Sequence, residues 1–262
     1  MNPAADRLAP ADNQAGDPLG GKARFHAPHR LRTGSVLAAG VSPASHLNKA
    51  ILCEVFGFPH VKTTGSSLPA EHPCPGTAVV VGENMNPGMR WEEFGAWLGA
   101  GLAVMDIRAM AGMARASGCP LTVDTEAGDS GRVLEVFHRR MRAPVYPLAP
   151  RIRIVEEVPA TAGFGTGDIL HFYHWSENTP ALATFRREDC FRRFLEGGRG
   201  AVLGISEITR NPTLVTFFTP AGGEITVMDL RAIDRAAEPS GAETHMWQLF
   251  LNALGFGSVV FG

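Results

Sequence analysis

The segment Gly76–Gly118, GTAVVVGENMNPGMRWEEFGAWLGAGLAVMDIRAMAGMARASG, alternates strand patterns with helix patterns. Thr77–Val81 is a short apolar run rich in β-branched residues, which is typical of a strand covered on both faces. From Arg90 to Leu98, apolar residues recur at spacings of three and four, which predicts an amphipathic helix. Leu102–Ile107 predicts a second buried strand, and 108–117 predicts a second helix that ends at a glycine. This order predicts a parallel βαβ unit with a right-handed crossover.

The pattern extends in both directions from this unit. Upstream, we predict a strand at 34–41, a helix at about 45–56 and a strand at 59–63. Downstream, we predict a short strand at 121–123, an acidic loop at 124–129, a helix at 130–142, strands at 151–158, 168–173, 181–185, 201–205, 214–218 and 224–230, and a closing helix at 243–254. Thr219–Gly223 (TPAGG) lies between two of these strands and is a strong hairpin signal, so the second half is expected to be antiparallel.

Length and composition predict one globular domain preceded by an arm. The chain has 262 residues, of which 45% are hydrophobic and 19% charged, as in ordinary globular proteins. Residues 1–32 have few large apolar side chains, so we expect a disordered N-terminal arm there and a single domain at 33–262. The basic end of the arm, Lys22–Arg32, fits either an interaction arm or a solvated lead-in.

Charge and apolar patterning exclude several classes of partner. A formal net charge of −2 gives no electrostatic basis for binding nucleic acid. No apolar run approaches the roughly 20 residues that span a bilayer, so membrane insertion is not expected. The four cysteines are scattered without a CxxC pair and no signal pattern opens the chain, which favours a cytoplasmic protein. The expected partner is a small polar molecule or another protein, and a homo-oligomer is possible.

Three short motifs carry a resemblance to a known superfamily. They are WLGAGLAVMDI at 97–107, GGRGAVLGISEI at 197–208 and the closing helix MWQLFLNALG at 246–255. With the order of elements, they make the chain similar to the class I glutamine amidotransferase-like superfamily, particularly its non-amidotransferase, trehalose-utilisation-type branch. The resemblance spans about 34–262. It implies an α/β fold, with a flavodoxin-like or amidotransferase-like, mostly parallel sheet flanked by helices and an antiparallel β extension in the C-terminal half, and a link to carbohydrate metabolism.

The chain departs from that superfamily at its key residue. Catalytic members place a cysteine on the turn from a strand into a helix, where the helix N-terminus lowers the thiol pKa. Here that turn is Asp106–Ala109 (DIRA), which contains neither cysteine nor serine. Acyl-enzyme chemistry at this position is therefore not expected. Cys119, which follows Gly118, is interpreted as a small buried hydrophobe.

Candidate ligand-binding residues follow the predicted strands, because ligands of doubly wound sheets bind beyond the carboxyl ends of the strands. After the strand at 77–81 come Glu83, Asn84 and Asn86, which suit hydroxyl or ammonium groups. The alternative is a turn whose asparagine side chains bind its own backbone. After the strand at 102–107 come Asp106, a candidate catalytic residue, and Arg108, a candidate ligand-binding residue; a structural ion pair between them is the alternative.

Further candidates lie in the second half of the chain. His171 is a candidate ligand-binding residue, and His174 with Glu177 loosely resembles the His-x-Glu part of an amidotransferase triad with one extra residue between them. Ordinary packing of imidazoles among aromatic rings is the alternative. Glu207, just past the strand at 201–205, is a further ligand-binding candidate. An acidic set (Asp124, Glu126 and Asp129) reads either as a divalent-cation site or as a solvated loop, and no metal site is predicted from it.

These observations lead to two hypotheses. The first is an amidotransferase-like protein without the catalytic cysteine that binds a small polar ligand, with a sugar as the family-level expectation, or serves as an accessory subunit of a larger complex. The second is a hydrolase or isomerase that acts on a polar metabolite by acid–base chemistry, with Asp106, His174 and Glu177 as the catalytic candidates and Glu83 as a further acid or base. No cofactor can be named from the sequence.

Overall fold

The computed structural model describes residues 34–42, 61–86, 88–127, 151–171, 181–196, 199–231 and 244–255. Its strands are β1 Ser35–Ala39, β2 Val61–Thr64, β3 Thr77–Val81, β4 Leu102–Asp106, β5 Val123–Ala127, β6 Arg151–Ile154, β7 Ile169–His171, β8 Ala181–Phe185, β9 Gly200–Ser206, β10 Pro212–Phe218 and β11 Glu224–Met228. Its helices are α2 Trp91–Leu98, α3 Ile107–Ala116, α5 Asp189–Leu195 and α7 Thr244–Ala253, with a 3₁₀ turn, η1, at Pro159–Thr161.

Nine of these strands form one sheet in the order β2-β1-β3-β4-β11-β10-β9-β6-β7. The strands from β2 to β11 are mutually parallel, and each later neighbour in the order is antiparallel to the one before it. β5 and β8 pair separately as a two-stranded antiparallel ribbon. The predicted α/β class, with a sheet flanked by helices, is confirmed, and the predicted hairpin is the β10–β11 pair.

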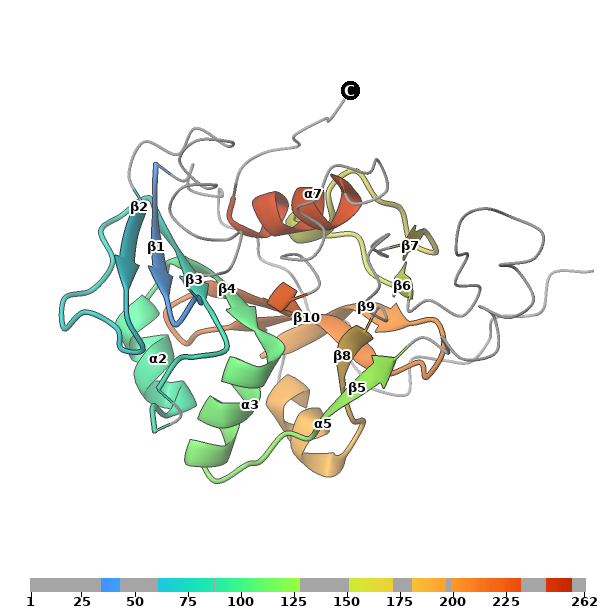
Figure 1. The fold of residues 1–262 in the computed structure, drawn as a ribbon, viewed down its shortest axis with the longest axis horizontal. Helices are drawn as coiled ribbons and strands as arrows, with labels where there is room; N and C mark the ends of the chain where they lie inside the picture. The colour runs from blue at the N-terminus through green and yellow to red at the C-terminus, as the bar shows by residue number, and fades with distance from the viewer. Residues whose placement is uncertain are drawn as a thin grey trace, which may run out of the picture.

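Helices cover both faces of the sheet. Figure 1 shows α7 above the sheet and α2, α3 and α5 below it. Strand residues alternate between the two sides, so that Val80 and Val104 join the core under α7 while Val79 and Met105 join the core with α2 and α3. All four of these side chains are fully buried. This explains why β3 and β4 have no polar face: both faces of the parallel strands are packed.

One local prediction is wrong, and one helix is missing from the predicted elements. The acidic stretch that begins at Asp124 was predicted as a loop, but residues 124–127 belong to β5 and pair with β8. Its composition resembles a loop, whereas in the ribbon Asp124 and Glu126 point to one side, are half-buried and have polar partners there. The helix α5 was not predicted, because its seven residues, DCFRRFL, are too few to display a helical period.

Some predicted elements lie outside the described residues. These are the arm at 1–32, the helix at 45–56 and the helix at 130–142. Among the residues that the structure describes, no helix is both long enough and apolar enough to cross a bilayer.

Candidate functional site

The carboxyl ends of β1, β3, β4 and β11 meet at one edge of the sheet, because these four strands are parallel. β1, β2 and β3 follow one another in the sequence, but in the sheet β2 lies on one side of β1 and β3 lies on the other side. Ligands of such sheets bind outside the carboxyl ends of the strands, next to the point where the strand order reverses. Polar side chains at this carboxyl edge are therefore the first candidates for binding a ligand.

The turns after β1 and β3 are packed against each other at this edge. The backbone N–H of Asn84 donates to the carbonyl oxygen of Gly40 over 3.0 Å, and the N–H of Gly82 donates to Ala39 over 2.8 Å. A Cβ atom on Gly82 would lie 2.3 Å from the Gly40 carbonyl oxygen. Only glycine at position 82 permits this approach, which holds the turn that carries Glu83 and Asn84 beside β1.

Asp106 is the last residue of β4 and caps the N-terminus of α3. Its Oδ1 accepts the backbone N–H of Arg108 over 2.8 Å, and its Oδ2 accepts the N–H of Leu230 over 3.1 Å. Its backbone has φ −64° and ψ 137°, ordinary extended values for an N-cap. The side chain is only 1% exposed. Its two oxygens are hydrogen-bonded to the start of α3 and to the segment after β11, so its first role is structural.

Arg108 lies between two carboxylates. Its Nη1 donates to Asp229 Oδ1 over 2.9 Å and lies 3.3 Å from Asp106 Oδ2, and its Nη2 donates to Asp229 Oδ2 over 3.4 Å. The fork of the guanidinium suits this two-point recognition of one carboxylate. Asp229 is 2% exposed, whereas the Arg108 side chain is 22% exposed, so the cation is the part of the network that reaches the surface.

Asp229 gathers further donors from two other segments. Its Oδ2 accepts the backbone N–H of Ala183 in β8 over 2.8 Å, and its Oδ1 accepts the N–H of Arg231 over 3.1 Å. The ribbon of β5 and β8 is thereby attached to the edge of the main sheet. A buried carboxylate needs such donors, because an unpaired charge would be costly away from water.

Glu83 and Arg231 form the outer part of the site. Arg231 Nε donates to Glu83 Oε2 over 2.5 Å, and its Nη2 contacts the same oxygen. Their side chains are 26% and 52% exposed. The site thus has a buried floor, formed by Asp106 and Asp229. Its accessible rim is formed by Glu83, Arg108 and Arg231.

The charges of the site act on one another. Burial raises the pKa of Asp106 to about 6, the nearby Asp229 charge adds to the rise, and Arg108 opposes it. Hydrogen bonding and charge from Asp229, with charge from Asp106 and Glu83, raise the pKa of Arg108 despite its burial. Arg108 therefore stays charged, and the raised pKa brings the titration of Asp106 close to neutral pH.

The structure places the predicted residues of the first half as follows. Asp106 and Arg108 form the ion pair that was the alternative for them, and Glu83 joins them through Arg231 and the charge it exerts on Arg108. Asn84 and Asn86 have exposed side chains on the same turn. Asn86 Oδ1 accepts the N–H of Gly88 over 3.0 Å, the self-bonded turn that was the alternative for this loop.

Among the candidates of the second half, Glu207 lies apart from this network. Glu207 contacts Arg153 and, over 3.0 Å, Arg210 in the turn between β9 and β10. The hydrogen bond from Arg153 outweighs burial and holds the pKa of Glu207 below its ordinary value. His171 ends β7 at the far edge of the sheet. His174 and Glu177 lie outside the described residues.

Asp229 and Arg231 are functional candidates that the sequence pattern did not indicate. Both follow β11, which was predicted as a strand of an antiparallel hairpin and was not expected beside β4. The available signal was a charged residue at the end of a buried strand, the same signal that identified Asp106.

The acidic residues of β5 are engaged in other contacts. Asp124 pairs with Arg186 over 2.6 Å, and Glu126 accepts the Ser206 hydroxyl over 2.5 Å and contacts the Thr209 hydroxyl. Asp129, the third member of this predicted acidic set, lies outside the described residues. Within the described ranges, no three histidine, cysteine or acidic side chains are arranged to hold a metal ion.

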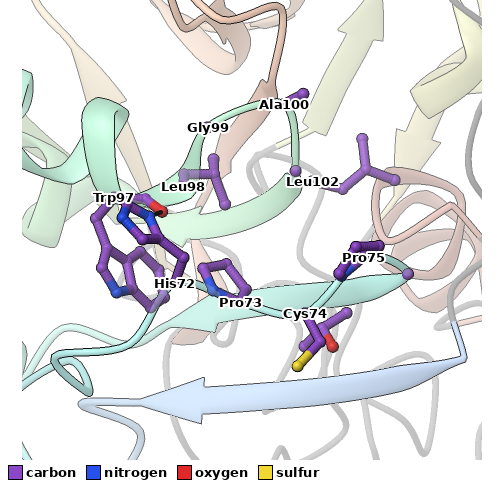
Figure 2. A pocket seen from close by; sticks show the side chains of 12 residues that line it. His72, Pro73, Cys74, Pro75, Trp97, Leu98, Gly99, Ala100 and Leu102 are labelled. Carbon is purple, nitrogen blue, oxygen red and sulfur yellow. Dashed lines mark hydrogen bonds between the residues drawn. The ribbon is translucent and has the colours of Figure 1, made fainter.

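A pocket of about 320 Å³ lies at the opposite, amino edge of β3 and β4. Figure 2 shows Trp97 and His72 at one side of it and Leu102 at the other, with the Pro73–Pro75 segment along it. His72 Nδ1 is 2.8 Å from the Trp97 carbonyl oxygen, and the Trp97 indole donates to Pro69 and Glu71 carbonyls. His72 Nδ1 and the Trp97 indole N–H are therefore engaged with backbone carbonyl oxygens, and no carboxylate or guanidinium lines the pocket.

Comparison with known proteins gives distant structural likeness alone. No protein-family model matches the chain, and no curated protein matches it significantly. The crystal structure of a glutamine amidotransferase from Thermotoga maritima is similar over 87% of this chain and 99% of that protein, with 11% identity and a TM-score of 0.40. A likeness at this level carries no argument about activity, so function has to be argued from the site.

Proposed function

We propose that this chain binds a small polar ligand at the carboxyl edge of β3, β4 and β11, as an amidotransferase-like protein without acyl-transfer chemistry. The observation that carries the proposal is that this edge has a buried floor of carboxylates and an accessible rim of charged side chains. Asp106 and Asp229 hold Arg108 in one orientation, and the rim presents Arg108, Arg231 and Glu83 together. A ligand with several polar groups is recognised by hydrogen-bond donors and acceptors in fixed positions, which these guanidinium and carboxylate groups can provide.

The strand order supports the placement of the ligand. The sequence β2-β1-β3-β4-β11 has the 2-1-3-4-5 arrangement of flavodoxin-like folds, in which ligands bind next to the reversal of strand order. Glu83 lies on the turn after β3, beside that reversal. The antiparallel strands β10, β9, β6 and β7 would then be an extension of a flavodoxin-like or amidotransferase-like sheet.

The ligand class and setting belong to the same proposal. A sugar is the first class to try, because the chain resembles the trehalose-utilisation-type branch of the amidotransferase-like superfamily. An accessory role in a cytoplasmic complex fits a turn at Asp106–Ala109 that contains no nucleophile. A protein partner or a second copy of this chain would supply the remaining walls of an open site.

An acid–base enzyme is the second candidate, and the pKa of Asp106 is the observation that favours it. A carboxyl group with a pKa of about 6 can exchange a proton near neutral pH. Both of its oxygens, however, already accept backbone N–H groups, and the side chain is 1% exposed. We therefore rank binding above catalysis for the described residues.

A thermal-shift screen tests this proposal. Sugars, amino acids, nucleotides and small carboxylates are added to the wild type, to Glu83→Gln and Arg231→Gln, and to the matched control Arg186→Gln, whose guanidinium forms an exposed pair with Asp124. A true ligand at a hundred times its dissociation constant stabilises the fold by about 2.7 kcal/mol. The proposal predicts a hit that both rim variants weaken and the control retains; a panel without any hit, or a hit unaffected in the rim variants, rejects it.

A further inference from the structure

Cys119 and Cys190, which are 71 residues apart in the chain, lie against each other below the sheet. The Cys119 Sγ is 3.7 Å from the carbonyl oxygen of Cys190. That oxygen and the Sγ of Cys190 are each two bonds from the same Cα atom. Rotation about the Cα–Cβ bond of Cys190 is the movement that can bring its Sγ toward Cys119.

The backbone around the two cysteines follows an antiparallel register. Val123 of β5 is opposite Phe185 of β8, and the N–H of Arg186 donates to the Thr122 carbonyl oxygen over 3.0 Å, one step beyond the strands. The Thr122 hydroxyl donates to Glu188 over 2.9 Å. Continuing this register brings residue 119 opposite the start of α5. The register thus brings the segment that contains Cys119 beside the first turn of α5, which contains Cys190.

We propose that Cys119 and Cys190 are a dithiol pair that small disulfides, such as oxidised glutathione, convert to an intramolecular disulfide. One thiol loses its proton, attacks a glutathione sulfur and releases one glutathione. The second thiol, as thiolate, then attacks the protein sulfur of this mixed disulfide and releases the other glutathione. Two protein thiols are oxidised and one glutathione disulfide is reduced to two thiols. The inference does not depend on the proposed ligand.

Two further observations bear on the reactivity of the pair. Both side chains are partly exposed, so a small disulfide can reach them. Burial, with the neighbouring Cys190 thiol adding to it, raises the pKa of the Cys119 thiol. Since the thiolate is the attacking species, bridge formation is expected to accelerate as pH rises.

Peptide mapping of the full chain tests the pair directly. Each of the four cysteines falls in its own tryptic peptide, with Cys119 in 116–132 and Cys190 in 188–192. The folded protein is incubated with oxidised glutathione, remaining thiols are alkylated, and the digest is analysed without reduction. The expected product is peptide 116–132 joined to 188–192 with the loss of two hydrogen atoms, in the wild type and in the control Cys74→Ser.

A second measurement uses stability. The bridge restrains the unfolded chain, so oxidation raises the Tm of the wild type by about 5–10 °C and leaves the Tm of Cys190→Ser unchanged. The proposal is overturned if Cys119 and Cys190 are recovered alkylated, or each bound to glutathione, under conditions in which exposed Cys74 has reacted. A disulfide of either residue with Cys53 or Cys74 also overturns it.

Discussion

Arg108 Nη1 lies 2.9 Å from Asp229 Oδ1, and this contact joins two residues that are 121 positions apart in the chain. It connects the start of α3, just past β4, to the end of β11, which are neighbours only because the C-terminal hairpin inserts beside β4. The pair thus fastens the C-terminal half of the sheet to its parallel half. The same pair places a guanidinium at the edge where we propose that a ligand binds.

Replacing Arg108 with methionine should destabilise the fold strongly. The change leaves Asp106 and Asp229 buried without their shared cation, and breaking a buried pair from one side typically costs about 3–5 kcal/mol. Urea denaturation measures the loss. Arg186→Met is the matched control, because its pair with Asp124 is exposed and water screens it, so its loss should change stability little. Equal losses in the two variants would show that the buried network does not stabilise the fold.

The stability of the wild type should decline as pH rises through the titration of Asp106. Its pKa is raised from 3.8 to about 6 in the folded chain, so the folded state holds a proton that the unfolded state has lost within this window. The contribution of Asp106 to the free energy of unfolding is therefore highest below pH 3.8. It decreases by about 3 kcal/mol as the pH rises past about 6. Subtracting the pH profile of Asp106→Asn, measured by thermal unfolding, isolates the effect.

Asp106→Asn is expected to be less stable overall, because an amide would face the Leu230 N–H with a donor. The informative quantity is therefore the slope of stability against pH. A difference profile that is flat between pH 3.8 and about 6 contradicts the assignment of the raised pKa.

Asp229→Asn should lower the pKa of Asp106. The Asp229 charge is the second-largest cause of the raised value, after burial, and the substitution removes it while burial remains. Carbon-13 NMR of the Asp106 carboxyl carbon follows this titration in both proteins. A pKa in Asp229→Asn that equals or exceeds the wild-type value would exclude charge coupling between the two carboxylates.

Gly82→Ala should be costly, whereas Gly65→Ala should be nearly neutral. A Cβ at position 82 would lie 2.3 Å from the Gly40 carbonyl oxygen, so one of the two turns must move, which costs about 1–3 kcal/mol. At position 65 no atom lies within 4 Å of such a Cβ. Chemical denaturation of both variants makes the comparison. Gly82→Ala at wild-type stability would mean that the turns after β1 and β3 are not held together as described.

Where a local pattern decides the structure, the sequence was sufficient. The elements of Gly76–Gly118 were predicted to within one residue at each end, because two buried strands and two helices display their own periods. The ion pair of Asp106 with Arg108 was likewise available as an alternative, since a charge at the end of a buried strand needs a partner.

Where distant pairing decides the structure, the sequence was insufficient. Nothing in β11 itself indicates that it is parallel to β4, so the place of Asp229 beside Arg108 was not foreseen. β5 was mistaken for a loop because its acidic composition outweighed a pairing with β8 that lies nearly 60 residues further along the chain. In both cases the missing information is which strand lies beside which.

The central claim is that a ligand binds at the carboxyl edge of β3, β4 and β11. Amide hydrogen exchange, measured with and without a ligand found in the screen, tests this claim most directly because it locates the bound ligand. The account predicts slower amide exchange in 82–86 and 229–231 of the wild type when ligand is added, and loss of this protection in Arg231→Gln. Protection confined to 72–77 and 97–102, where the pocket of Figure 2 lies, would contradict a site at the carboxyl edge.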